Sequence, residues 1–201
     1  EPTKHQYDFD SAACLALIRK AGLENEIHLN IEVNHATLSG HNFEHEIAYA
    51  IANNALGSID INRGDTLLGW DTDQFPNNPL ELLMPFYHIF SNGGFKQGGL
   101  NFDAKIRRQS IDPEDLFYAH IGGMDVAARS LIAVEKMIND KELSSYIKNR
   151  YKKWDQDLGK FIHSKEGNLE TIANKVISEN IEPEPQSGQQ EYLENILNKY
   201  L

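Results

Sequence analysis

Six side chains within the first 103 residues are candidate ligands for divalent cations: Glu32, His35, Asp60, Asp71, Asp73 and Asp103. Two ionised acids about 4 Å apart repel by about 4 kcal/mol at an effective dielectric of roughly 20. Acids that gather in one pocket must therefore be neutralised by protonation or by a cation. Carboxylate oxygens with a single imidazole suit Mg²⁺ or Mn²⁺, and this number of acids favours a site for two ions.

The spacing of these residues indicates how they come together. Residues 27–32, 58–62 and 100–103 alternate apolar and polar side chains, which predicts three strands with one apolar and one polar face. In a (β/α)8 barrel, inward-pointing residues at the carboxyl ends of different strands converge on one point. The residues expected to meet there are Glu32, Asp60 and Asp103 from the strands, with His35 three residues after Glu32, and Asp71 and Asp73 in a loop.

Helical patterns separate the predicted strands, which is typical of βα units. A helix capped by Asp10 and ended by Gly22 precedes the first strand, and a second helix follows it from Phe43. Pro85 lies within the helix before the last strand, so that helix is expected to kink or to begin near Met84. The sequence therefore predicts an α/β fold, the C-terminal part of a (β/α)8 barrel.

The second half of the chain is expected to be helical. A helix begins at Asp112-Pro113, Gly122-Gly123 is predicted to break it, and another helix is predicted for 125–140. No strand pattern follows residue 141, and a last helix carries Leu193, Ile196, Leu197 and Tyr200. We predict two parts: residues 1–140, with the βα units and metal ligands, and 141–201, a helical extension that suits an oligomerisation arm.

Composition excludes several classes of function. The formal charge of -11 disfavours binding to the phosphates of nucleic acids, and no apolar run is long enough to span a membrane. The single cysteine, Cys14, rules out a disulfide framework and suits a reducing compartment, so a cytoplasmic location is expected. The chain opens Glu1-Pro2-Thr3 without an initiator Met, and we expect it to be part of a longer protein.

Two other functions compete with the dinuclear site. Residues 41–45 fit the His-x-x-Glu-His pattern of inverted zinc proteases, so a zinc hydrolase that uses His41 and His45 is one alternative. A catalytically silent module that binds metal or sugar, or holds subunits together, is the other. Glu32 and His35 also match one Glu-x-x-His element of di-iron bundles, but that site needs two copies and no second copy is found.

Several long motifs together identify a family. Residues 31–37, 60–65, 69–76 and 99–105, with Gly122-Gly123-Met124-Asp125, closely resemble xylose isomerase, in its longer-chain class. The resemblance covers nearly the whole chain, as its C-terminal portion, and implies a (β/α)8 barrel that holds two divalent cations, Mg²⁺, Mn²⁺ or Co²⁺. It implies isomerisation of D-xylose to D-xylulose, and usually of D-glucose to D-fructose, and a homotetramer.

The resemblance also assigns roles to the candidate residues. One cation, which binds the sugar, matches Glu32, Asp60 and Asp103, and the catalytic cation matches Glu32, His35, Asp71 and Asp73, so that Glu32 bridges the two. An aspartate at the position of Asp73 assists a metal-bound water that takes a proton from the sugar, and a hydride then moves between C2 and C1. The family's remaining metal glutamate, its polarising lysine and its ring-opening histidine and aspartate belong upstream of Glu1. We therefore expect this chain to pack against the missing N-terminal part of the barrel.

Overall fold

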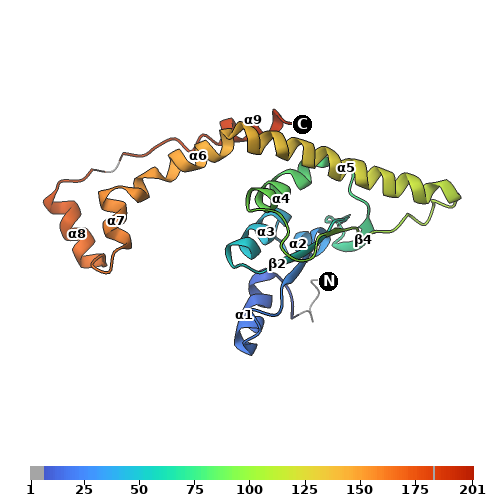
Figure 1. Cartoon of the computed structure of the whole chain (residues 1–201), viewed down its shortest axis with the longest axis horizontal. Coiled ribbons are helices and arrows are strands. Elements are labelled where there is room, and N and C mark those ends of the chain that lie inside the picture. The colour runs from blue at the N-terminus through green and yellow to red at the C-terminus, as the bar shows by residue number, and fades with distance from the viewer. Residues whose placement is uncertain (1–6, 183) are drawn as a thin grey trace. The chain divides into compact units, whose positions relative to one another are not determined.

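A computed structural model describes residues 7–182 and 184–201 of the chain (Figure 1). The chain divides into two compact units, one ending at Ile138 and the other covering residues 139–200. The first unit contains every candidate metal ligand, and the second is built from helices.

The first unit is organised by a parallel sheet of three strands in the order β1-β2-β5. The strands are β1 (Leu29–Glu32), β2 (Leu56–Asp60) and β5 (Leu100–Asn101). Strands β1 and β5 are shorter than the predicted segments, and β2 begins and ends two residues earlier than predicted. The three strands run parallel as expected, and the register places Glu32 opposite Asp60 and Asp60 opposite Asn101. The carboxyl ends of neighbouring strands therefore carry the acids side by side.

Four helices accompany this sheet: α1 (Ser11–Ala21), α2 (Val33–Leu38), α3 (Phe43–Ala52) and α4 (Pro79–Ser91). Asp10 caps α1, as predicted, because its side chain accepts a hydrogen bond from the backbone of Ala13. Gly22 ends this helix with a φ of 70°, a left-handed conformation that glycine adopts without strain. Asn42 caps α3 in the same way as Asp10 caps α1.

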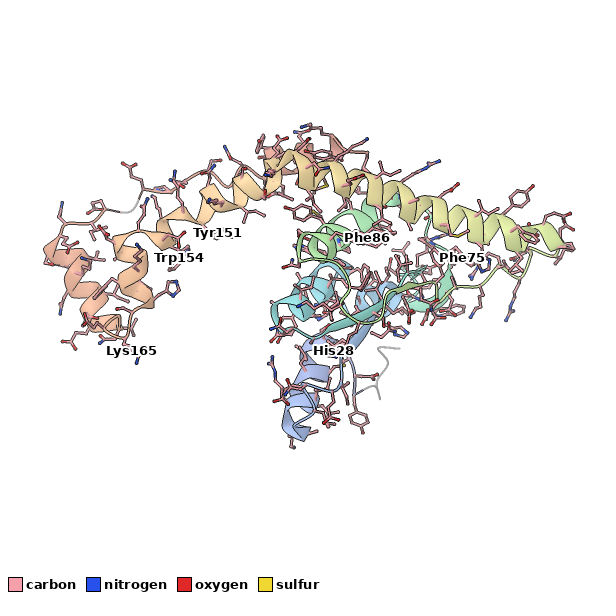
Figure 2. All side chains as sticks on the ribbon, viewed as in Figure 1. His28, Phe75, Phe86, Tyr151, Trp154 and Lys165 are labelled. Atoms are coloured by element: carbon pink, nitrogen blue, oxygen red, sulfur yellow. The ribbon has the colours of Figure 1, made fainter. Side chains whose placement is uncertain are left out.

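The apolar core lies between the sheet and these helices. Helices α3 and α4 lie side by side (Figure 1), and Ile47 of α3 and Phe86 of α4 are fully buried. Ile59, on the apolar face of β2, is also fully buried. Figure 2 labels both Phe86, which is buried, and Trp154 of the second unit, which is exposed. Burial of the apolar strand face fixes the phase of each strand, and the phase in turn fixes where the acids point.

The segment predicted as a loop with Asp71 and Asp73 is a β-hairpin. Strands β3 (Arg63–Asp65) and β4 (Trp70–Gln74) pair antiparallel, with Arg63 opposite Gln74. Gly69 has a φ of 69° at the turn between them. Asp71 and Asp73 both lie on β4, and their side chains are hydrogen-bonded to each other. The loop prediction was therefore wrong.

Helix α4 does not begin near Met84. It begins at Pro79, where proline suits the first helical position, and the side chain of Asn78 caps it by accepting a hydrogen bond from the backbone of Leu80. Pro85 lies within the helix and is buried. The Asn78-Pro79 pair therefore determines where the helix begins, and the helix continues through Pro85.

Gly122 and Gly123 do not break the following helix. Helix α5 is continuous from Pro113 to Asp140. Gly123 is buried, and a Cβ there would lie 3.0 Å from Cδ1 of Phe75 and 3.4 Å from Cε1 of Phe102. The glycine is used for close approach to two aromatic rings, so packing overrides its low helix propensity.

The second unit contains the end of α5, then α6 (Glu142–Tyr151), a 3-10 turn (Lys152–Asp155), α7 (Asp157–His163), α8 (Leu169–Ser178) and α9 (Gln190–Asn198). No strand occurs among its described residues, in agreement with the sequence. Lys199, just after α9, pairs with Glu142 at 2.8 Å, and the Tyr192 hydroxyl lies 3.1 Å from the same carboxylate. The last helix is therefore bonded to the start of α6 in its own chain.

In the part of the chain that the structure describes, no helix is long and apolar enough to cross a bilayer. The observed architecture is a mixed α/β unit followed by helices. The parallel sheet joined by helical crossovers is the arrangement that βα units produce.

The adjacent glycines of α5 offer a matched test of this packing. We expect Gly123→Val to lower the free energy of unfolding by about 1–3 kcal/mol, because the added methyl groups collide with Phe75 and Phe102. Gly122→Val should change it by less than about 1 kcal/mol, because a Cβ at Gly122 meets nothing within 4 Å. Urea unfolding of both variants measures the difference, and equal effects would contradict the assigned role of Gly123.

Candidate metal centre

Glu32 lies at the centre of the candidate site. It is the last residue of β1 and is only 7% exposed. Its Oε1 accepts a hydrogen bond of 2.6 Å from the Asn62 amide, and its Oε2 lies 3.2 Å from Nδ1 of His35. A buried carboxylate is strongly destabilising unless it is hydrogen-bonded or paired, and here it is both.

His35 connects Glu32 to the hairpin. It lies on α2, which begins directly after β1, so the three-residue spacing from Glu32 brings the imidazole back over the strand end. Its second nitrogen, Nε2, lies 3.0 Å from Oδ2 of Asp71. Each nitrogen of the ring therefore faces one carboxylate, and ligand atoms of Glu32, His35 and Asp71 all lie within 4.8 Å of one another.

Asp71 is held on its other side by a buried amide. Asn34, which is fully buried, donates its side-chain N–H to Asp71 Oδ1, and its backbone N–H donates to Asn62 Oδ1 at 3.0 Å. A Cβ at residue 64 would collide with the Asn34 amide, so the hairpin approaches this closely because residue 64 is glycine. Within the described residues, Asn34 Oδ1 is buried with no hydrogen-bond partner.

A second cluster shares Glu32. Ligand atoms of Glu32, Asp60 and Asp103 also lie within 4.8 Å of one another. Asp60 is oriented by two amides, since its Oδ2 accepts from Asn30 at 2.6 Å and its Oδ1 accepts from Asn101 at 3.1 Å. Asp103 follows β5 rather than ending it, and its backbone carbonyl accepts from Asn62 at 2.9 Å.

Asp73 lies beside this centre without belonging to either cluster. Its carboxylate pairs with the ammonium group of Lys105. The backbone of Lys105 also donates to the Asp73 carbonyl at 2.8 Å, and Arg107 donates to the same carbonyl at 3.0 Å. The segment after β5 is thus tied to β4 through Asp73, which adopts a left-handed φ of 43°.

Burial and neighbouring charges shift the pKa values of the acids in this centre. Burial raises the pKa of Glu32, against the lowering effects of Asn62 and His35, and the Asp71 and Asp103 carboxylates raise it further. Burial also raises the pKa of Asp71, and so does the neighbouring Asp73. For Asp73, burial is outweighed by Lys105 and by a hydrogen bond with Asp71, and its pKa lies below the ordinary value. The pKa values of Glu32 and Asp71 are thus raised, whereas that of the neighbouring Asp73 is lowered.

The residues of the zinc alternative lie together elsewhere on the unit. Ligand atoms of His41, His45 and Glu46 are within 4.8 Å of one another. Glu44, the acid of the His-x-x-Glu-His pattern, instead pairs with Nε2 of His88 at 3.1 Å. His41 and His45 therefore lie close to Glu46, whereas Glu44 of the pattern pairs with a different residue.

Sequence reasoning missed the residues that orient the acids. These are the amides Asn30, Asn34, Asn62 and Asn101, and the cation Lys105. The signal was present for three of the amides, because Asn30, Asn62 and Asn101 lie on the polar faces of the predicted strands. A polar face that carries amides beside acids indicates a site in which the carboxylates are held by hydrogen bonds.

Comparison with known proteins finds two kinds of match. Residues 147–201 match a family model described as the XylA2 C-terminal domain. Over all 201 residues, the chain is 58% identical to the curated xylose isomerase of Histophilus somni, 55% to that of Haemophilus influenzae and 54% to that of Mesorhizobium japonicum. In each case the match covers 100% of this chain and 46% of the relative. The chain therefore spans about half the length of these relatives.

The raised pKa of Glu32 predicts how stability depends on pH in the metal-free protein. The folded chain keeps this proton at pH values where the unfolded chain has lost it, so the free energy of unfolding falls as pH rises from the ordinary glutamate range through the raised pKa. Glu32→Gln cannot ionise and should lose this part of the slope. Urea unfolding in EDTA over a pH series measures it.

Glu24→Gln, at an exposed glutamate, is the matched control and should keep the slope of the original protein. Parallel pH profiles for Glu32→Gln and the original chain would contradict the burial of an ionisable Glu32.

Proposed function

We propose that this chain, a homologue of xylose isomerases along its whole length, supplies the metal-binding part of an enzyme that converts D-xylose to D-xylulose. D-glucose, converted to D-fructose, is the second expected substrate. The observation that carries the proposal is the position of Glu32, which belongs to two separate clusters of ligand atoms at once. A carboxylate shared in this way is the usual bridge between two cations.

The residues present fit two divalent cations. The donor set consists of carboxylates with one imidazole, which suits Mg²⁺, Mn²⁺ or Co²⁺ better than a thiol-binding ion. The pKa values of the buried Glu32, which both clusters share, and of the half-buried Asp71 are raised. Among the described residues, Asn34 Oδ1 is an additional buried acceptor without a donor. A pocket of this kind is stabilised by added positive charge.

The proposed ligands divide as the clusters do. Glu32, His35 and Asp71, with Asp73 beside them, would hold one cation, and Glu32, Asp60 and Asp103 would hold the other. When bound, the cations supply Lewis acidity and a template that orients the hydroxyl groups of an open-chain sugar. The amides of Asn30, Asn62 and Asn101 fix the carboxylates in advance, which reduces the reorganisation needed for binding.

Asp73 has a distinct role in this proposal. Lys105 keeps its pKa low, so its carboxylate stays ionised where Glu32 and Asp71 hold protons more readily. An ionised carboxylate at the edge of the cluster can accept a proton from the sugar side of the site or complete the coordination of a cation. Catalysis by Asp73, with Asp71 as its partner on β4, is therefore proposed.

The proposal extends to fold and assembly. The parallel β1-β2-β5 sheet, with its acids at the carboxyl ends of the strands, supports a C-terminal part of a (β/α)8 barrel. The match of residues 147–201 to a C-terminal domain model supports a helical extension, which we propose to act as the arm of a homotetramer. A cytoplasmic location is proposed from the single, partly buried Cys14.

The first test removes one proposed ligand. Asp71→Asn should weaken Mn²⁺ binding by roughly a hundredfold at the cation site nearer His35, since even residues that only orient ligands contribute 10–100-fold. Mn²⁺ binding at the Glu32–Asp60–Asp103 cluster should be affected less. Calorimetric titration of Mn²⁺ resolves the two classes of site.

Asp65→Asn is the matched control, because Asp65 lies in the same hairpin and only accepts backbone hydrogen bonds from Leu67 and Leu68. It should leave Mn²⁺ binding unchanged. Unaltered Mn²⁺ binding in the double variant Asp71→Asn with His35→Ala would show that these residues are not ligands.

The second test concerns turnover. The 201-residue chain covers 46% of the relatives' length, and the residues that we assign to the proposed site include no counterpart of the family's polarising lysine or ring-opening pair. The chain alone should therefore not isomerise D-xylose, and addition of a complementary N-terminal segment from a relative should restore activity. Robust isomerisation of D-xylose by the purified chain, with its mass verified, would contradict the proposal that the N-terminal segment supplies essential catalytic residues.

A further inference from the structure

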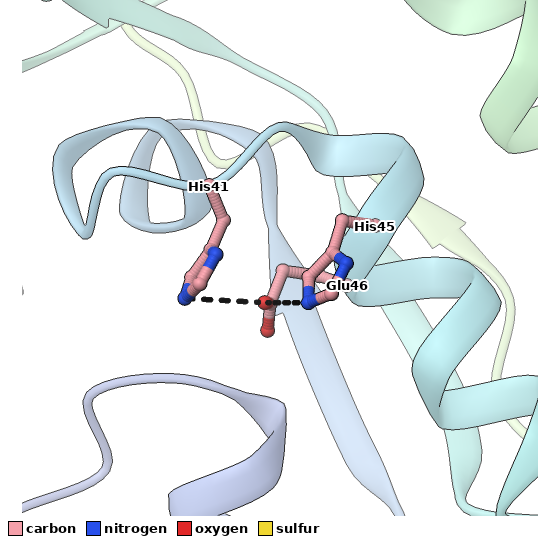
Figure 3. Close-up of side chains that lie close together, drawn as sticks. All are labelled: His41, His45 and Glu46. Atoms are coloured by element: carbon pink, nitrogen blue, oxygen red, sulfur yellow. Dashed lines mark ion pairs between the residues drawn. The ribbon is translucent and has the colours of Figure 1, made fainter.

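A cluster of nitrogen and oxygen donors outside the proposed catalytic centre has no place in the sugar chemistry. It is formed by His41, His45 and Glu46, from the start of α3 and the loop before it (Figure 3). Figure 3 shows the Glu46 carboxylate between the two imidazoles. The Nε2 atoms of His41 and His45 each lie 4.0 Å from the same oxygen, Oε1 of Glu46.

These distances suit a shared cation better than they suit hydrogen bonds. At 4.0 Å the imidazole nitrogens are beyond hydrogen-bond range of Glu46 Oε1. With metal–ligand bonds of 2.0–2.2 Å, the ligands of a tetrahedral Zn²⁺ lie about 3.4 Å apart. Each imidazole nitrogen needs to move about 0.6 Å closer to Glu46 Oε1, and rotation of the partly exposed His41 and His45 side chains allows this.

The negative charge of the cluster also favours a bound cation. Glu46 is only 4% exposed, and its Oε2 accepts a hydrogen bond of 2.7 Å from the backbone of Ser11. Nε2 of His41 also lies 3.2 Å from Oδ2 of Asp10, so a second carboxylate faces the same ring. Within the described residues, no lysine or arginine pairs with either acid. A divalent cation would offset both charges.

We propose that His41, His45 and Glu46, with Asp10 as a fourth donor, form an accessory site for a nitrogen-preferring divalent ion such as Zn²⁺. Two imidazoles select Zn²⁺ over Mg²⁺, whereas the proposed catalytic centre has one imidazole among carboxylates and suits harder ions. The accessory ion joins the beginning of α1, where Asp10 is the cap, to α3. Its role is to clamp these two helices together.

The accessory site stays close to the catalytic centre without sharing a ligand with it. A cavity of about 110 Å³ is lined by Asp10 and Glu46 and also by Glu32 and His35. The experiment must therefore separate zinc bound at the accessory site from zinc that displaces Mg²⁺ from the catalytic centre. A saturating background of Mg²⁺ and variants of each site accomplish this.

Zn²⁺ is titrated calorimetrically into the 201-residue chain in saturating Mg²⁺, and thermal melting is followed with and without Zn²⁺. We expect one equivalent of Zn²⁺ to bind and to raise the melting temperature. His45→Gln, at a half-exposed position where folding is not at risk, should weaken this binding by roughly tenfold to a hundredfold and abolish the zinc-dependent rise in melting temperature.

His88→Gln is the matched control, because His88 also pairs with a glutamate, Glu44, but has no second imidazole on that carboxylate. It should leave the Zn²⁺ equivalent intact, as should Asp71→Asn in the proposed catalytic centre. Zinc binding that survives His45→Gln, or that is lost in Asp71→Asn instead, would overturn the accessory site. The second of these results would leave the proposed isomerase site in place.

Discussion

The structure depends on one electrostatic constraint: a carboxylate that is almost completely buried, Glu32, lies among three other acids. Burial and the neighbouring Asp71 and Asp103 raise its pKa. The protein compensates with an amide from Asn62 and an imidazole from His35, both within 3.2 Å. These contacts bring together the carboxyl end of β1, the first turn of α2, the segment after β2 and the β3–β4 hairpin.

Amide side chains carry out most of that positioning. Asn62 is 1% exposed and contacts Glu32, the Asp103 carbonyl and the backbone of Asn34. Amides can orient carboxylates without adding charge, so they leave the pocket negative and open to cations. Lys105 acts differently, because its ammonium group pairs directly with the Asp73 carboxylate and lowers the pKa of that acid. The centre therefore combines acids that gain from a cation with one acid that is already paired.

The sequence predicted those features of the site that depend on the alternation of apolar and polar residues along the strands. Alternation on the strands located Glu32, Asp60 and Asp103 together, because burial of Ile31 and Ile59 leaves the acids only the opposite face. The features that the sequence analysis missed depend on tertiary packing and on strand pairing. The β3–β4 hairpin is polar and has no apolar alternation, and Gly122-Gly123 contains the usual break signal although Gly123 approaches Phe75. Lys105 and Glu46 could not be assigned, since their partners are set by long-range contacts.

The central claim is that Glu32 bridges two cations. The most direct measurement is anomalous diffraction from crystals of the chain assembled with a complementary N-terminal segment and soaked in Mn²⁺. The account predicts two anomalous peaks, one bounded by His35 and Asp71 and the other by Asp60 and Asp103, with a Glu32 oxygen as ligand to each. A single peak, or two peaks of which one or both lack Glu32, would contradict it.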